Sequence, residues 1–221
     1  MPLAMPQSED WRIDAPADAE AAPLLILAHG AGAPMDSPFM QRMAELLTAH
    51  GIAVARFNFG YMARAQREGR KIAPPRAERL MDEYRARVAE WHALGHTPFI
   101  GGKSMGGRVA SMLADELFTA RQAAGLVCLG YPFHAPGRPE RLRIDHLKAL
   151  RAPVLICQGE RDPFGKREEV EGYPLAGTIR FCWLPDGDHD FKPRVKSGET
   201  WAGNMEMAAD CAAAFIKNTA R

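Results

Sequence analysis

The 221-residue chain has no excess of either charge, because 28 Lys and Arg residues offset 27 Asp and Glu residues and leave a net charge of +1. Such a balance gives no general attraction to nucleic acid or to an anionic membrane surface. No apolar run approaches the roughly 20 residues that cross a bilayer. Residues 1–11 lack the basic start and apolar core of a secretory signal. We therefore expect neither nucleic acid nor membrane as a partner.

Cysteine is scarce, with four residues at positions 128, 157, 182 and 211. Cys128, Cys157 and Cys182 fall in three separate predicted strands, and Cys211 falls in a predicted helix. No two of them have the spacing of a metal site. We therefore expect buried reduced thiols, no metal or other cofactor, and a cytoplasmic protein.

The composition is that of a globular protein, with 47% apolar and 25% charged residues. Repeats, low-complexity segments and linkers are absent. A single domain of this length buries roughly 70% of its unfolded surface. We predict an N-terminal segment over residues 1–22, with an edge strand at Trp11–Asp14, and one α/β domain over residues 23–221.

Apolar runs and helical periodicities alternate along that domain. The expected strands are Leu24–Ala28, Ile52–Phe57, Pro98–Gly101, Gly125–Leu129, Val154–Cys157 and Ile179–Leu184. Helices are expected from the cap Ser37 to before Gly51, over Ala77–Ala93, after Ser104, over Ile144–Leu150 and over Trp201–Lys217. This alternation predicts a mostly parallel sheet of about six or seven strands, covered by helices on both faces.

The most informative motif places Ser104 between Gly102 and Gly106, where the strand ending at Gly101 meets a helix. A turn this tight holds its central residue at strained backbone angles, and the residues two places away must lack side chains. The pattern is typical of a nucleophile elbow. Gly-Lys-Ser also ends phosphate-binding loops, but that motif needs a glycine where Thr97 stands, so the nucleotide-binding alternative fails.

A serine nucleophile needs a base and an acid that orients the base. Among seven histidines, His189 alone follows the last strand, in an aspartate-rich turn that can reach the elbow. Asp162 follows the strand Val154–Cys157 and precedes a proline, which favours an extended conformation. We therefore predict Ser104, Asp162 and His189 as a triad, with Glu160 or Asp188 as alternative acids.

Two backbone amides are expected to stabilise an oxyanion. Met105 supplies one at the start of the elbow helix. The other comes from the loop His29-Gly30-Ala31-Gly32, with Ala31 as first choice and Gly32 as second. This loop lacks the third glycine of a dinucleotide-binding motif, because Met35 stands in its place.

Aromatic and histidine side chains follow several strand ends and are candidate substrate-binding residues: Tyr61, Tyr131, Phe133, His134 and Phe164. Between Met62 and Arg79 the chain is strongly basic, with Arg64, Arg67, Arg70, Lys71, Arg76 and Arg79. Such a run more often forms a solvated loop and helix face, although it could meet an anionic substrate or an acidic partner.

These motifs resemble those of the α/β-hydrolase superfamily, and the match runs from about Leu24 to the end of the chain. The sequence is most similar to small lidless members akin to dienelactone hydrolases and predicted bacterial esterases. It looks closest to a compact family that includes regulatory proteins of animal chromatin complexes. The resemblance rests on residues 29–32, 102–108, 129–132, 159–165 and 188–193. It implies Ser104 as nucleophile, Asp162 as acid and His189 as base.

The resemblance leaves several functions open. The leading hypothesis is a serine hydrolase of small esters, thioesters or related carbonyl compounds; a non-catalytic scaffold and a small peptidase are the alternatives. Dienelactone hydrolases use a cysteine nucleophile, so Ser104 argues against their specific reaction. The segment Tyr131–Leu142 is too short for a helical lid, which predicts an open site. The sequence does not settle whether the chain forms a homo-oligomer.

Overall fold

A seven-stranded sheet forms the centre of the molecule in the computed structural model, which describes residues 3–19 and 22–220. The strand order is β1-β3-β2-β4-β5-β6-β7. All neighbours are parallel except β1, which pairs antiparallel with β3 at one edge. The strands are β1 Trp11–Asp14, β2 Leu24–Ala28, β3 Ala53–Phe57, β4 Phe99–Lys103, β5 Gly125–Leu129, β6 Val154–Gly159 and β7 Ile179–Leu184.

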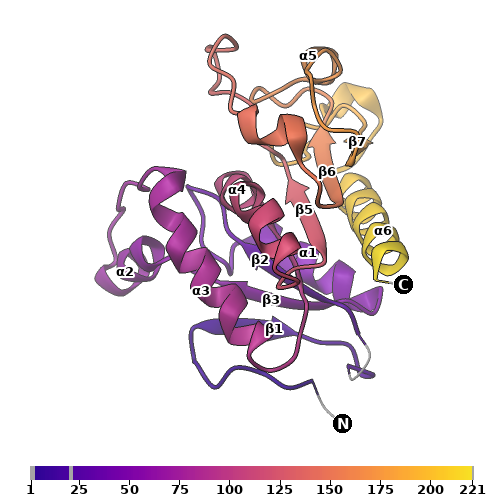
Figure 1. Cartoon of the computed structure of the whole chain (residues 1–221). Helices are drawn as coiled ribbons and strands as arrows, with labels where there is room; N and C mark the ends of the chain where they lie inside the picture. Colours follow the sequence, from indigo (N-terminus) through magenta and orange to yellow (C-terminus); the bar gives the residue numbers. More distant parts are fainter. Residues whose placement is uncertain (1–2, 20–21, 221) are drawn as a thin grey trace.

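Helices cover both faces of this sheet (Figure 1). Helices α1 Pro38–Ala49 and α6 Trp201–Thr219 pack against each other on one face, and α3 Met81–His92 and α4 Met105–Thr119 pack on the other. Short helices complete the fold: α2 Gly60–Glu68, α5 Arg167–Val170, and the 3₁₀ helices η1 Ala77–Leu80, η2 Asp145–Ala149 and η3 Val195–Ser197.

The continuous apolar runs are explained by burial on both sides. In β2, Leu24, Ile26 and Ala28 contribute to the core under α3 and α4, while Leu25 and Leu27 contribute to the core under α1 and α6. Successive side chains of a strand point to opposite faces, so each residue of a sheet covered twice must be apolar. The predicted α/β-hydrolase fold, with a mostly parallel sheet and helices on both faces, is confirmed.

Two short helical segments bear on the predictions. The basic stretch after Met62 forms a solvated loop and helix face, as expected, and its first part belongs to α2, whose left-handed Gly69 ends the helix. Arg64 and Arg70 are exposed there and pair with Glu68. The expected helix Ile144–Leu150 is instead the single 3₁₀ segment η2. Segments of one turn carry too little periodicity for a sequence pattern to define them.

The expectation of four reduced cysteines is wrong for one pair. Cys182 in β7 and Cys211 in α6 form a disulfide, with their Cα atoms 6.4 Å apart. Cys128 and Cys157 are free and buried. No pattern along the chain indicates this bond, because its partners have a sequence separation of 29 and meet only when α6 packs on β7. The cytoplasmic location, which rested partly on reduced thiols, stays a prediction.

No helix in residues 3–19 and 22–220 has the length and apolar character needed to cross a membrane. The segment between β5 and η2 contains turns and the isolated bridge Ala135–Arg138. It contains no helix that could fold over the sheet as a lid.

Candidate active site

Ser104 stands at the strained turn between β4 and α4. Its φ is 52° and its ψ is −115°, outside the regions that side chains ordinarily allow. A Cβ on Gly102 would lie 2.5 Å from the Gly106 carbonyl carbon, and a Cβ on Gly106 would lie 2.6 Å from the Ala28 oxygen. Both glycines are therefore required by close backbone contact, as the sequence pattern predicts.

His189 reaches this serine from the loop after β7. Its Nε2 lies 2.8 Å from Ser104 Oγ, and its Nδ1 lies 2.7 Å from Asp162 Oδ2. The Phe164 ring packs beside the imidazole, with the two ring centres 4.2 Å apart. The three side chains that the sequence separates by up to 85 positions thus form one hydrogen-bonded line.

Asp162 is completely buried, and a network of donors surrounds its carboxylate. Oδ1 accepts a hydrogen bond from the Phe164 amide at 2.8 Å, and Oδ2 accepts one from Gln158 Nε2 at 3.0 Å. Hydrogen bonds of this kind stabilise a buried carboxylate and fix its direction. Gln158 is not among the predicted site residues, because it follows an apolar run in β6 and nothing local to the sequence indicates that its buried side chain reaches Asp162.

The two alternative acids have other partners. Glu160 accepts hydrogen bonds from Arg167 and from the Asp186 amide. Asp188 Oδ1 accepts from the amides of Asp190 and Lys192, both at 2.9 Å, and so shapes the turn. Of the three acids, Asp162 is the one whose carboxylate forms a hydrogen bond with the His189 ring.

Two of the three expected oxyanion donors, Met105 and Ala31, line the cavity that contains Ser104. Within the described residues, the N–H groups of Met105 and Ala31 donate no hydrogen bond, and neither does that of Gly32. Met105 is the first residue of α4, where the helix dipole favours negative charge. The pair of oxyanion donors, Met105 with Ala31 or Gly32, stays a prediction.

His29 fixes the loop that carries Ala31, a role that its position in the sequence does not indicate. Its Nδ1 lies 2.6 Å from the Gly30 oxygen, and the Phe59 amide donates to its Nε2 at 3.1 Å. A carbonyl can only accept, so Nδ1 carries the proton and the ring is neutral. Burial lowers the pKa of His29, which favours this neutral form. Because Gly30 C=O and Ala31 N–H belong to one peptide plane, the imidazole also fixes the direction of the Ala31 amide.

A cavity of about 400 Å³ opens beside Ser104. It is lined by Ala31, Pro75, Arg76, Ala77, Glu78, Ser104, Met105, Arg108, Pro132, Arg143 and Phe164. Ala31 also borders a mostly apolar cavity of about 640 Å³, whose walls include Met62 and Ile72. Ser104 thus lines a charged cavity, and Ala31 borders both that cavity and the apolar one.

Four of the five expected substrate-binding residues do not line the cavity that contains Ser104. Tyr131 and Phe133 are fully buried and pack edge to face, with ring centres 4.8 Å apart. His134 is 3% exposed. Tyr61 donates its hydroxyl to the Ala31 oxygen at 3.2 Å, and burial raises its pKa to about 12. These four residues follow strand ends, but their side chains are buried in the protein interior. Of the five, Phe164 is the one that lines the cavity with Ser104.

A second serine–histidine contact lies within the core side of α4. Ser111 Oγ is 2.8 Å from His146 Nε2, but it donates its proton to the Arg108 oxygen at 2.7 Å. Ser111 is 1% exposed, and no acid contacts the ring of His146 among the described residues. This pair lacks the access and the orienting acid that a nucleophile needs.

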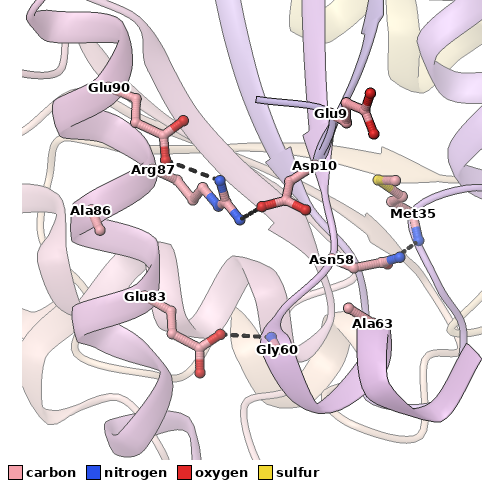
Figure 2. Close-up of a pocket in the computed structure, with 10 residues that line it drawn as sticks. All are labelled: Glu9, Asp10, Met35, Asn58, Gly60, Ala63, Glu83, Ala86, Arg87 and Glu90. Atoms are coloured by element: carbon pink, nitrogen blue, oxygen red, sulfur yellow. Dashed lines mark hydrogen bonds and ion pairs between the residues drawn. The ribbon is translucent and has the colours of Figure 1, made fainter. Parts of the chain in front are cut away.

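Another cavity, lined by acidic side chains, lies away from Ser104 (Figure 2). Its acids have structural partners: Asp10 and Glu90 bind Arg87 at 2.8 and 2.9 Å, and Glu83 accepts the Gly60 amide at the start of α2. These contacts tie the N-terminal segment to α3. Among the described residues, no group of three or more His, Cys, Asp or Glu side chains is arranged to hold a metal.

Comparisons with known proteins agree with this architecture. A family profile described as "Alpha/beta hydrolase domain" matches residues 21–217. The chain therefore belongs to the α/β-hydrolase family. Its compact form without a lid is that of the dienelactone hydrolase and esterase structures that it resembles.

Solved structures share the fold at low identity. Dienelactone hydrolase from Anabaena variabilis is 19% identical, with a TM-score of 0.69 over 94% of this chain and 90% of that one. The esterase domain of a Rhodothermus marinus protein is 17% identical, with a TM-score of 0.67 over 94% and 92%. Est1E from Butyrivibrio proteoclasticus, solved with ferulic acid, is 16% identical, with a TM-score of 0.68 over 98% and 99%. Likeness at these identities shows a shared fold.

Proposed function

We propose that this protein is a serine hydrolase that cleaves small esters, thioesters or related carbonyl compounds through an acyl-enzyme on Ser104. The observation that carries the proposal is the line of two hydrogen bonds, 2.8 and 2.7 Å long, from Ser104 through His189 to Asp162. A serine hydroxyl is protonated at neutral pH and becomes nucleophilic only when a positioned base removes its proton.

In the acylation step, Ser104 Oγ bonds to the substrate carbonyl carbon while its proton moves to His189 Nε2. The carbonyl electron pair moves to the oxygen, which the Met105 and Ala31 amides would stabilise. Asp162 stabilises the imidazolium through Nδ1. Collapse of the intermediate breaks the bond to the leaving group, which takes the proton from His189.

Deacylation repeats these roles with water. His189 takes a proton from a water molecule while the water oxygen bonds to the acyl carbon. The bond between the acyl carbon and Ser104 Oγ then breaks, and Oγ takes the proton from His189. The acid product leaves, and the triad is restored. This cycle uses the side chains of Ser104, His189 and Asp162 and calls for no cofactor, and its substrate would be a small molecule that enters the open cavity.

Labelling with a fluorophosphonate tests the proposal against the scaffold alternative. We expect a single adduct whose mass maps to the peptide with Ser104, no adduct on Ser104→Ala, and an adduct on the control Ser111→Ala. A folded wild-type protein that takes no label would support a non-catalytic scaffold.

A panel of p-nitrophenyl esters tests the open, lidless site. We expect kcat/KM to be highest between acetate and butyrate, because a shallow cavity buries little of a long chain. Turnover that keeps rising with chain length would contradict this and would point to the apolar cavity beside Ala31 as an acyl site. A parallel panel of p-nitroanilides separates the ester from the peptidase alternative.

A further inference from the structure

Three arginines from distant parts of the chain line the cavity beside Ser104. Arg76 precedes η1, Arg108 lies in α4, and Arg143 lies between β5 and η2. Glu78 is the one carboxylate in the same lining. The walls of this hollow therefore carry an excess of two positive charges, although the whole chain is almost neutral.

Glu78 is already engaged by one of these arginines. Arg108 donates to Glu78 Oε1 at 2.8 Å. A hydrogen bond from the Glu78 backbone amide, together with the Arg108 charge, lowers the pKa of Glu78. The Arg108 Nε atom is buried and has no acceptor. Within residues 3–19 and 22–220, no carboxylate forms an ion pair with Arg76 or Arg143. Arg76 is exposed and Arg143 is partly buried, so their guanidinium groups are free to meet an anion that enters the cavity.

Arg143 is the best placed of the three to hold a ligand. Its amide donates to the Phe133 oxygen at 2.7 Å, and its own carbonyl accepts the Tyr131 hydroxyl at 2.9 Å. Partial burial and the neighbouring Arg108 charge lower the pKa of Arg143. Its backbone is fixed while its guanidinium faces a like charge, an arrangement that a bound anion would relieve.

We propose that this cavity binds a carboxylate on the substrate, with Arg143 as its main ligand and Arg76 beside it, so that the enzyme prefers small esters bearing a negative charge. The inference rests on the proposed function, because Ser104 lines the same cavity. A planar guanidinium can donate two parallel hydrogen bonds to a carboxylate, which makes the recognition directional.

Two matched substrate pairs test this. The first is p-carboxyphenyl acetate and p-(methoxycarbonyl)phenyl acetate, which differ by a charge on the leaving group. The second is mono(p-nitrophenyl) glutarate and p-nitrophenyl valerate, which differ by a charge on the acyl group. After subtraction of spontaneous hydrolysis, we expect Arg143→Gln to lower kcat/KM for the charged ester of at least one pair about tenfold or more. The neutral esters should change less than about twofold.

The matched control is Arg141→Gln, an exposed arginine two positions away that does not line the cavity. It should leave both pairs unchanged, and Arg143→Lys should restore part of the preference. Because the hydrogen bonds of residue 143 use backbone atoms, the variants should fold, which circular dichroism would verify. Equal losses on charged and neutral esters, or no loss on either charged ester, would overturn the proposal.

Failure of the proposed function would look different, because no ester would then be hydrolysed. The carboxylate site can still be tested by calorimetric titration of Ser104→Ala with benzoate. Weaker binding to Ser104→Ala/Arg143→Gln would support the site. Equal binding to the two variants, or binding to neither, would overturn it.

Discussion

The ammonium of Lys103 donates a hydrogen bond of 2.8 Å to the backbone oxygen of His189. The lysine precedes Ser104 in the elbow, so this contact joins the loop of the proposed base directly to the loop of the proposed nucleophile. Lys103 is 7% exposed and also lies 3.4 Å from Asp190 Oδ1. Burial lowers the pKa of Lys103, and the surrounding carboxylates oppose that shift.

Replacing Lys103 should loosen the histidine loop. In Lys103→Met the stem is kept and the donor is lost, so we expect kcat to fall about tenfold while KM changes little, because the geometry of proton transfer suffers more than binding. Steady-state kinetics on p-nitrophenyl acetate would measure this. Lys192→Met, which changes an exposed lysine of the same loop, is the control. An unchanged kcat in Lys103→Met would show that the His189 loop keeps its position without the hydrogen bond from Lys103.

The imidazole of His29 should matter for kcat without touching the triad. His29→Phe keeps the ring but loses the contacts to Gly30 and Phe59, so the Ala31 amide is free to turn away from the oxyanion. We expect kcat to fall about 10- to 100-fold, somewhat less than removal of an oxyanion donor costs. His50→Phe, on the surface end of α1, is the control. A folded His29→Phe variant with normal kcat would argue that Ala31 is not a donor.

Gln158 should support both stability and activity. In Gln158→Met, Asp162 loses one donor, and the Tyr131 amide loses its acceptor at 2.7 Å. Each buried group left unsatisfied costs about 1–3 kcal/mol. We expect the free energy of unfolding in urea to fall by about that amount and kcat/KM to fall with it. Gln41→Met, in the exposed part of α1, should change neither quantity.

The sequence predicts the elements that depend on a repeated local pattern. Strands β5 and β7 and the edge strand β1 occur at the expected residues, because each is bounded by turn residues and has a buried face. The elbow could also be predicted, since Gly102 and Gly106 reflect a steric need that is local to the turn.

Contacts between distant segments could not be predicted in this way. Gln158, Lys103 and His29 act through single hydrogen bonds to loops that come together only in the folded chain. The Cys182–Cys211 bond and the burial of Tyr131 likewise depend on how neighbouring elements pack. A pattern along the chain shows which residue types follow a strand, but it does not show whether they turn toward the cavity or the core.

The Cys182–Cys211 bond should add measurable stability. It closes a loop with a sequence separation of 29, for which the chain-entropy estimate is about 3–4 kcal/mol. We expect Cys182→Ser/Cys211→Ser to unfold at a lower urea concentration than the wild type, with an unfolding free energy lower by up to this amount. Alkylation of the unfolded wild type without reductant should modify two cysteines, and with reductant four. Four modified cysteines without reductant would mean that the bond is absent in solution.

Acid should destabilise the fold partly through His146. Burial, together with the Arg108 charge, lowers the pKa of His146 to about 4, from an ordinary value near 6.5. Above pH ~6.5 the ring is neutral in both states, so it contributes no pH dependence. Between pH ~6.5 and ~4 the unfolded chain takes up a proton that the folded chain does not, and stability falls as the pH falls. Below pH ~4 both states are protonated and the loss stays constant. Its size is at most about 3 kcal/mol, less the part that water screens.

His146→Gln tests this, because glutamine can still donate to Ser111 but does not titrate. We expect the fall in unfolding free energy between pH 7 and pH 4.5 to become smaller in the variant, measured by urea denaturation at each pH. Some acid sensitivity should remain, because the pKa of His29 is also lowered by burial and acts in the same direction. His92→Gln, which changes an exposed histidine of α3, should leave the pH dependence as it is in the wild type. If the unfolding free energy falls equally in the wild type and in His146→Gln, the pKa of His146 is not lowered in the folded protein.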